Sequence, residues 1–371
     1  MAKKSMVLRG LTAMFTFVFS LSIVAGVILE GYKSTIDTNL GTQSEKFVSE
    51  STEADPLYNK FTPSAEVLNE DGTGNSHALI QKAMNLNRQQ AAEGAVLLKN
   101  ENNALPLASG AKVTLLGIRS HVPLVGSSFG VKAWGGFINL EQALSQNKTD
   151  FANTITTSMN TNRQTGETTV GRTVSSWSGD EFDFEGAGYE INPTMVNIYE
   201  KLNETYNHAN NESPAEVYDP GEPSLAEIAA VDSSYESSFA QYGDAAIVVI
   251  SRPSAESKDY LPGGIVEGLG ADEPLALTTN ERDIIETAKK ASDKVIVLVN
   301  TATAVEIGDL KNDPDIDAIL WIGFPGCYGM TGIADILCGR TSPSGGLPDI
   351  YPTYNMSAPA MQNMGKMYYT N

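Results

Sequence analysis

The chain has 371 residues and carries 25 basic against 45 acidic side chains, a net charge of −20. This balance argues against a nucleic-acid partner, because phosphate binding needs a surplus of Lys and Arg. An apolar content of 41% is sufficient for one large domain or two ordinary ones.

The N-terminus contains a stretch that could span a membrane. Residues 10–29 carry no charge, and about twenty such residues match the thickness of a bilayer core. Lys3, Lys4 and Arg9 precede the stretch and Glu30 follows it, which predicts an N-terminus inside and a main body outside the cytoplasm. A cleaved signal peptide, which would make the protein secreted, is the alternative. The length of the apolar run favours an uncleaved single-pass anchor over residues 1–30.

A polar, Ser-, Thr- and Glu-rich stretch over residues 31–75 is typical of a stalk. Apolar residues at helical spacing then predict a helix that starts at Ser76 and ends near Gly94, followed by a short strand and a turn up to residue 107. Residues 112–117 form a buried strand, and a loop rich in Gly and Ser covers residues 126–136.

The middle of the chain is less regular. A helix starts at Asn139, and the Thr/Ser/Asn-rich stretch 150–179 is aperiodic, which predicts an inserted loop. Residues 188–202 predict a short strand and an amphipathic helix with Pro193 at its start. Residues 225–242 are weakly helical.

The stretch AAIVVISRPSAESKDYL, residues 245–261, combines a buried strand with a polar loop. Its apolar run at 245–250 predicts a strand with both faces covered. Ligands collect at the carboxyl ends of parallel strands, so Glu256, six residues beyond this run, is a candidate for chemistry. The other interpretation is a solvated acid in an acidic protein.

The last part of the chain alternates strands with helices. A helix capped by Thr278 or Thr279 precedes a strand at 294–300, and a second strand at 318–323 precedes a helix at 329–337. This alternation predicts an α/β fold, a three-layer sandwich with a mostly parallel sheet between helices.

Histidine and cysteine do not suggest a metal site. His77, His121 and His208 lie far apart, and none falls into ligand spacing with Cys327 or Cys338. We therefore expect neither a metal nor another cofactor. The two cysteines are expected to be small, buried apolar residues and not a disulfide.

Four ordered stretches resemble the α/β sandwich (C-terminal-type) domain of glycoside hydrolase family 3. They are AAEGAVLLKNENNALPL (91–107), GAGYEINP (186–193), the strand and loop at 245–261, and WIGFPGCYGMTGIADILCGRTSPSGGLPDIYP (321–352). The family includes β-glucosidases and β-xylosidases. The resemblance implies a sandwich domain over residues 76–358 and a tail at 359–371. One departure is the Cys-Tyr-Gly at 327–329, where many members have Gln-Glu-Gly or Gln-Gly-Gly.

The resemblance also concerns a second domain. Members of the family have a (β/α)8 barrel that carries the nucleophilic aspartate, and no such motif is found in this chain. The stretch before the sandwich is too short for a barrel of about 250 residues. The order of segments resembles a permuted, membrane-anchored subgroup in which the sandwich comes first, and implies a barrel supplied in cis or in trans.

Retaining glycosidases need two carboxylates about 5 Å apart, a nucleophile and an acid/base. In the family the acid/base is a glutamate on a sandwich-domain loop, and the match falls on Glu256. Asp259 is the competing acid, and Glu267 and Glu273 are rivals only if the loop folds back. The resemblance implies a β-glucosidase-like hydrolase that acts on β-glycosides or oligosaccharides, with no nucleophile in this chain.

Two further residues are candidates for substrate binding. Trp134, in a Gly-rich loop, could stack on a sugar, while Trp321 at the end of a buried strand is expected to belong to the core. Arg252 could orient a substrate hydroxyl or pair with a nearby acid. A membrane-anchored accessory domain that binds carbohydrate without catalysis is the alternative function.

Overall fold

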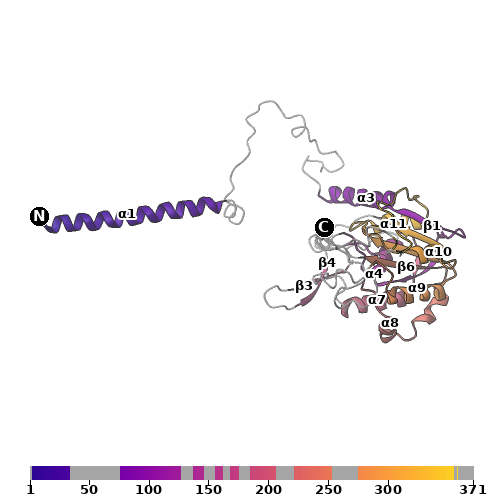
Figure 1. Cartoon of the computed structure of the whole chain (residues 1–371). Helices are drawn as coiled ribbons and strands as arrows, with labels where there is room; N and C mark the ends of the chain where they lie inside the picture. The colour runs from indigo at the N-terminus through magenta and orange to yellow at the C-terminus, as the bar shows by residue number, and fades with distance from the viewer. Residues whose placement is uncertain are drawn as a thin grey trace, which may run out of the picture. The chain divides into compact units, whose positions relative to one another are not determined.

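The computed structural model describes residues 2–33, 76–126, 137–145, 155–161, 168–174, 184–205, 221–252, 275–354 and 357 (Figure 1). The chain divides into two units, residues 1–63 and 64–371. In the first unit, α1 (Ala2–Gly31) is a single helix of 30 residues. By length and composition its segment Met6–Gly31 could cross a membrane, a test that a signal sequence also passes.

The second unit is built on a six-stranded sheet with the order β1-β8-β7-β6-β2-β5. All neighbouring strands are parallel except β1, which runs antiparallel to β8 at one edge. This arrangement confirms the predicted mostly parallel sheet. The strands are β1 (Val96–Asn100), β2 (Lys112–Leu116), β5 (Glu190–Ile191), β6 (Ala245–Arg252), β7 (Val295–Thr301) and β8 (Ala318–Trp321).

The central strands β6 and β7 are buried along their whole length. Alternate side chains of β6 enter two different cores, with Ala245, Ile247 and Val249 in one and Ala246, Val248 and Ile250 in the other. A strand covered on both faces needs a continuous apolar run, and the sequence supplies one.

Helices cover both faces of the sheet, and in Figure 1 α3 and α11 lie on the side opposite α7, α8 and α9. The first core receives side chains from α3 (Ser76–Gly94), α6 (Leu140–Ser145) and α11 (Met330–Leu337). The second core receives them from α4 (Ile118–His121), α7 (Pro193–Thr205), α8 (Leu225–Val231), the 3₁₀ helix η3 (Tyr235–Gln241), α9 (Thr279–Ala291) and α10 (Gly308–Asn312).

Two expectations are corrected. The strand predicted to end at residue 250 continues through Arg252, which pairs with Thr301 of β7. The residue before a proline favours extended backbone, and Pro253 follows. The prediction of an irregular loop over 150–179 was wrong for β3 (Ile155–Thr161) and β4 (Thr168–Val174), which form an antiparallel hairpin. Both strands are rich in threonine, whose branched side chain suits a pleated strand.

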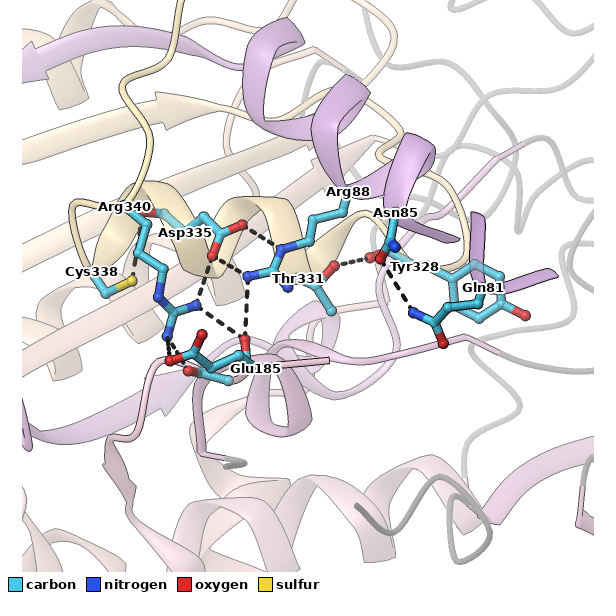
Figure 2. Close-up of polar contacts among 10 residues, drawn as sticks. Gln81, Asn85, Arg88, Glu185, Tyr328, Thr331, Asp335, Cys338 and Arg340 are labelled. Carbon is cyan, nitrogen blue, oxygen red and sulfur yellow. Dashed lines mark hydrogen bonds and ion pairs between the residues drawn. The ribbon is translucent and has the colours of Figure 1, made fainter. Parts of the chain in front are cut away.

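A charged cluster joins α3 to α11 on the first core (Figure 2). The Arg88 guanidinium donates to both Asp335 carboxylate oxygens, from Nε and Nη2, at 2.5 Å each. Arg340 Nη1 donates to the same carboxylate at 2.8 Å, and both arginines also donate to the Glu185 carbonyl. The paired geometry is the strong bidentate form of an Arg–carboxylate contact. Cys338, close to this cluster, and Cys327 are free thiols, as predicted, but both are half-buried and not buried as expected.

The contact between α3 and α11 depends on a glycine. A Cβ atom at Gly332 would lie 2.1 Å from the Arg88 carbonyl oxygen and 2.9 Å from the Ala92 backbone nitrogen. Both neighbours are main-chain atoms of α3, so a rotamer change cannot make space. The backbones can pack at this distance only because residue 332 has no side chain.

We expect Gly332→Ala to destabilise the second unit, although alanine is about 1 kcal/mol better than glycine inside a helix. The overlap with α3 should outweigh this gain and lower the free energy of unfolding by about 1–3 kcal/mol. Urea denaturation followed by circular dichroism measures the change. Gly346→Ala is the matched control, since a Cβ there meets nothing within 4 Å. Equal stabilities of the two variants would contradict this account of the packing.

Candidate functional site

The carboxyl edge of the parallel strands is the candidate site. β2, β6, β7 and β8 all end at this edge, because they are parallel neighbours. Open α/β sheets bind ligands there. The loop predicted to carry Glu256 starts at this edge, directly after Arg252.

Several predicted site residues lie outside the described part of the chain. They are Glu256, its competitors Asp259, Glu267 and Glu273, and Trp134. Their roles stay predictions, and the described residues show only how the segments that contain them are attached. Trp321 lies at the end of β8 and packs against the second core, as expected.

Arg252 is the one predicted site residue that the structure describes. Its side chain is 1% exposed, as is that of Glu281, and Nη1 lies 2.7 Å from Glu281 Oε1. Nη1 also donates to the Ser251 carbonyl, and Nη2 donates to the Ala276 carbonyl. The structure therefore shows the acid pairing that was one of the two roles predicted for Arg252. The substrate contact stays a prediction.

Glu281 has a second set of contacts at the start of α9. Its Oε2 accepts from the Thr278 backbone N–H at 2.9 Å, while the Thr278 hydroxyl accepts from the Glu281 N–H at 3.2 Å. This reciprocal pair is a capping box, and it confirms Thr278 as the N-cap. One carboxylate thus joins the last residue of β6 to the first turn of α9.

A second anchor holds the segment that contains Trp134. Asn300, near the end of β7, accepts from the Leu124 N–H at 2.7 Å and donates to the Leu124 carbonyl at 2.9 Å and the Gly323 carbonyl at 2.7 Å. The Gly326 N–H donates to the Val125 carbonyl at 2.9 Å, and the Ile138 N–H donates to the Cys327 carbonyl at 2.8 Å. Both ends of the segment 127–136 are thereby bonded to the loop after β8.

A buried carboxyl group that the sequence did not reveal lies at the end of β2. Glu222 Oε2 accepts from the Ile118 N–H at 2.8 Å, and Tyr199 Oη accepts from the Gly117 N–H at 2.8 Å. Gly117 has φ of 88°, and a Cβ there would lie 2.5 Å from the Val249 carbonyl oxygen, so the turn requires glycine.

Burial raises the pKa of Glu222 to about 8, against the opposing effects of the Ile118 N–H and the Arg119 charge. Its other oxygen, Oε1, is buried without a hydrogen-bond partner, as is the Ser251 hydroxyl at the end of β6. A carboxyl in such surroundings is held protonated near neutral pH. Glu222 lies in an irregular stretch directly before α8, where no apolar pattern indicates burial.

Among the described residues, no group of three His, Cys, Asp or Glu side chains could hold a metal ion. The polar side chains that the described part of this edge brings together, among them Arg252, Asn300 and Glu222, are buried.

Comparisons with known proteins agree with this architecture. The sequence model of the glycosyl hydrolase family 3 C-terminal domain matches residues 95–370. Beta-glucosidase A of Butyrivibrio fibrisolvens is 26% identical over 310 residues, which cover 79% of this chain and 31% of that protein. The exo-1,4-beta-xylosidase of Aspergillus niger is 26% identical over 288 residues, or 73% of this chain and 26% of that protein.

A solved structure shows the same fold. The beta-glucosidase of Paenibacillus barengoltzii superimposes with a TM-score of 0.54 at 25% identity, over 76% of this chain and 25% of that chain. The present chain thus spans about a third or less of the length of each of these three relatives.

The raised pKa of Glu222 predicts a pH dependence of stability. Between the ordinary value of 4.5 and about 8, the folded chain retains a proton that the unfolded chain releases. The contribution of protonated Glu222 to the free energy of unfolding is therefore complete below pH 4.5 and is lost as the pH rises through about 8. The free energy of unfolding falls over this range by at most on the order of 1 kcal/mol per pH unit. We expect Glu222→Gln, which keeps the acceptor for Ile118, to lose less stability than wild type between about pH 5 and about pH 8.5.

Thermal unfolding at a series of pH values measures this difference. Glu93→Gln, an exposed substitution on α3, is the control and should follow wild type. Parallel pH curves for wild type and Glu222→Gln would show that Glu222 is ionised in the folded chain.

Proposed function

Because the chain belongs to glycosyl hydrolase family 3 through its C-terminal domain, we propose that it functions in the hydrolysis of β-glycosides. Glu256 is the proposed proton donor. The observation that carries this proposal is the family match over residues 95–370, together with the position of β6, whose carboxyl end leads directly into the segment with Glu256. Relatives named as beta-glucosidases and a xylosidase support an O-glycosyl bond as the target.

The proposed reaction is a retaining, two-step hydrolysis. The Glu256 carboxylic acid donates its proton to the glycosidic oxygen as the bond to the anomeric carbon breaks, and a nucleophilic carboxylate forms a glycosyl ester. The Glu256 carboxylate then accepts a proton from water, whose oxygen attacks the anomeric carbon and releases the nucleophile. Each cycle consumes one water and returns both carboxyl groups to their starting states.

We propose that the nucleophile comes from a (β/α)8 barrel domain, in cis or in trans. The relatives named above are about three to four times as long as the stretch that matches this chain. A site divided between two domains would place the acid on this chain and most of the sugar pocket on the other. Trp134 is proposed to stack on the substrate from this side.

We also propose that α1 anchors the protein in a membrane, with residues 76–358 as the sandwich domain outside the cytoplasm. The apolar segment Met6–Gly31 is long enough to span a bilayer, and the basic residues before it favour this orientation. Residues 31–75 would then form a stalk, and residues 359–371 a tail toward the barrel. Cleavage of α1 as a signal peptide would instead give a secreted form.

The decisive test is hydrolysis by the full chain mixed with the barrel domain of a family 3 β-glucosidase. We expect turnover of aryl β-glucosides or β-xylosides that Glu256→Gln lowers by about 10²–10⁴-fold, the range that a general acid contributes. A chromogenic aryl glycoside assay measures it. Glu267→Gln and Glu273→Gln are the matched controls, because they remove carboxylates from the same segment.

A loss confined to Glu267→Gln or Glu273→Gln would assign the acid to that residue instead. Absence of turnover on all these substrates, with the barrel domain and without it, would contradict the enzyme proposal. In that case, binding of a β-linked oligosaccharide that Trp134→Ala abolishes would support the carbohydrate-binding alternative.

A further inference from the structure

The buried arginine at the end of β6 bonds to residues on the far side of the segment 253–274. Arg252 is the last described residue before that segment, and Leu275 is the first after it. The Arg252 guanidinium donates to the Ala276 carbonyl and pairs with Glu281, so it connects the two flanks directly. The Glu306 N–H donates to the Leu275 carbonyl at 2.9 Å, which fixes the same flank to the chain after β7.

This connection is hard to break. Both charged side chains are 1% exposed, and loss of one partner would leave a buried charge uncompensated. The planar guanidinium of an arginine fixes the directions of its donors. Glu281 Oε2 also accepts from the Thr278 N–H, so the contact of Arg252 with Glu281 connects the end of β6 to the start of α9.

The connection acts close to the proposed proton donor. Glu256 is four residues beyond Arg252, so the two Cα atoms are at most about 14 Å apart. A displacement of about 1 Å between reacting groups can cost on the order of 10²-fold in rate. Fixed ends of this segment therefore affect the reaction rate, whereas the ends of an ordinary surface loop do not.

We propose that Arg252 and Glu281 are a positioning pair, which sets where the segment with the acid leaves and rejoins the domain. This inference rests on the proposed function of Glu256. In this role Arg252 acts through the segment, since its guanidinium is buried and donates to the Ser251 and Ala276 carbonyls and to Glu281. Charged pairs elsewhere, such as Arg88 with Asp335, stabilise the domain without this effect on the acid.

Two variants disturb the pair while limiting the cost to folding. Arg252→Lys keeps the charge and loses the planar fork. The double variant R252Q/E281Q removes both charges, and the glutamine introduced in place of Glu281 can still complete the capping box. The matched control is R88Q/D335N, which removes the Arg–carboxylate pair between α3 and α11. Circular dichroism establishes that each full-length variant is folded before it is compared.

Trypsin cleavage after Lys258 reports the attachment of the segment without any assay of activity. Lys258 is the only basic residue between positions 253 and 274, and Pro253 prevents cleavage after Arg252. We expect both pair variants to be cut at Lys258 at least about 10-fold faster than wild type, because local opening becomes easier. The control should be cut at the wild-type rate. Unchanged cleavage in both pair variants would overturn the proposal, whatever the activity.

Leaving-group dependence separates positioning from mere stability. A 2,4-dinitrophenyl β-glycoside needs little protonation of its leaving oxygen, whereas an unactivated alkyl β-glycoside needs it fully. With the barrel domain present, the pair variants should lose about 10²-fold in kcat/KM, which reports the first step alone, on the alkyl substrate and less than about 3-fold in kcat/KM on the dinitrophenyl substrate. The control should lose equally on both. Equal losses in the pair variants would overturn the positioning role.

The two measurements distinguish the inference from the function on which it rests. If wild type hydrolyses neither substrate, the proposed function fails, and the cleavage rate at Lys258 alone decides whether the pair fixes the segment. If wild type is active and the pair variants differ from it in neither measurement, the positioning pair fails and the proposed function stands.

Discussion

The central strands of this sheet have no face in contact with solvent, and this constraint determines where chemistry can occur. β6 and β7 place alternate side chains in two separate cores, each covered by its own group of helices. A polar side chain in the middle of either strand would be buried without access to water, at a cost of several kcal/mol unless it found a partner. Polar groups are therefore confined to the strand ends, where backbone and side chains can satisfy them.

The carboxyl ends of β2, β6 and β7 follow this principle with three different residues. Arg252 pairs with Glu281, Asn300 bonds two loops through one amide, and Glu222 accepts from the turn after β2. In each case a buried polar side chain fixes a loop base at the edge. These contacts are structural in themselves, but they determine where the loops with the proposed acid and the proposed aromatic platform begin. A different polar contact joins two helices of the first core, the arginine–aspartate cluster between α3 and α11 (Figure 2).

A divided active site gives such anchors a particular importance. If the nucleophile is supplied by another domain, the distance between the two carboxylates depends on two things. They are the place where the segment with Glu256 joins this domain and the contact between the two domains. The buried pair at Arg252 would control the first of these. Glu222, bonded to the turn after β2 at Ile118, adds a carboxyl group to this edge, and burial raises its pKa.

The sequence by itself determined the fold class and most of the elements, because continuous apolar runs and helix caps are local signals. The strand at 245–250, the helix after Thr278 and the parallel sheet were all found in this way, and ordered motifs indicated the family. The hairpin at 155–174 was missed because its threonine-rich strands have no apolar pattern. Only the tertiary structure decided the pairing of Arg252 with Glu281, 29 residues away, the two bonds of Asn300 to Leu124, 176 residues away, and the bond of the buried Glu222 to Ile118, 104 residues away. Contacts over such separations depend on how strands and helices pack, and a local sequence pattern does not predict them.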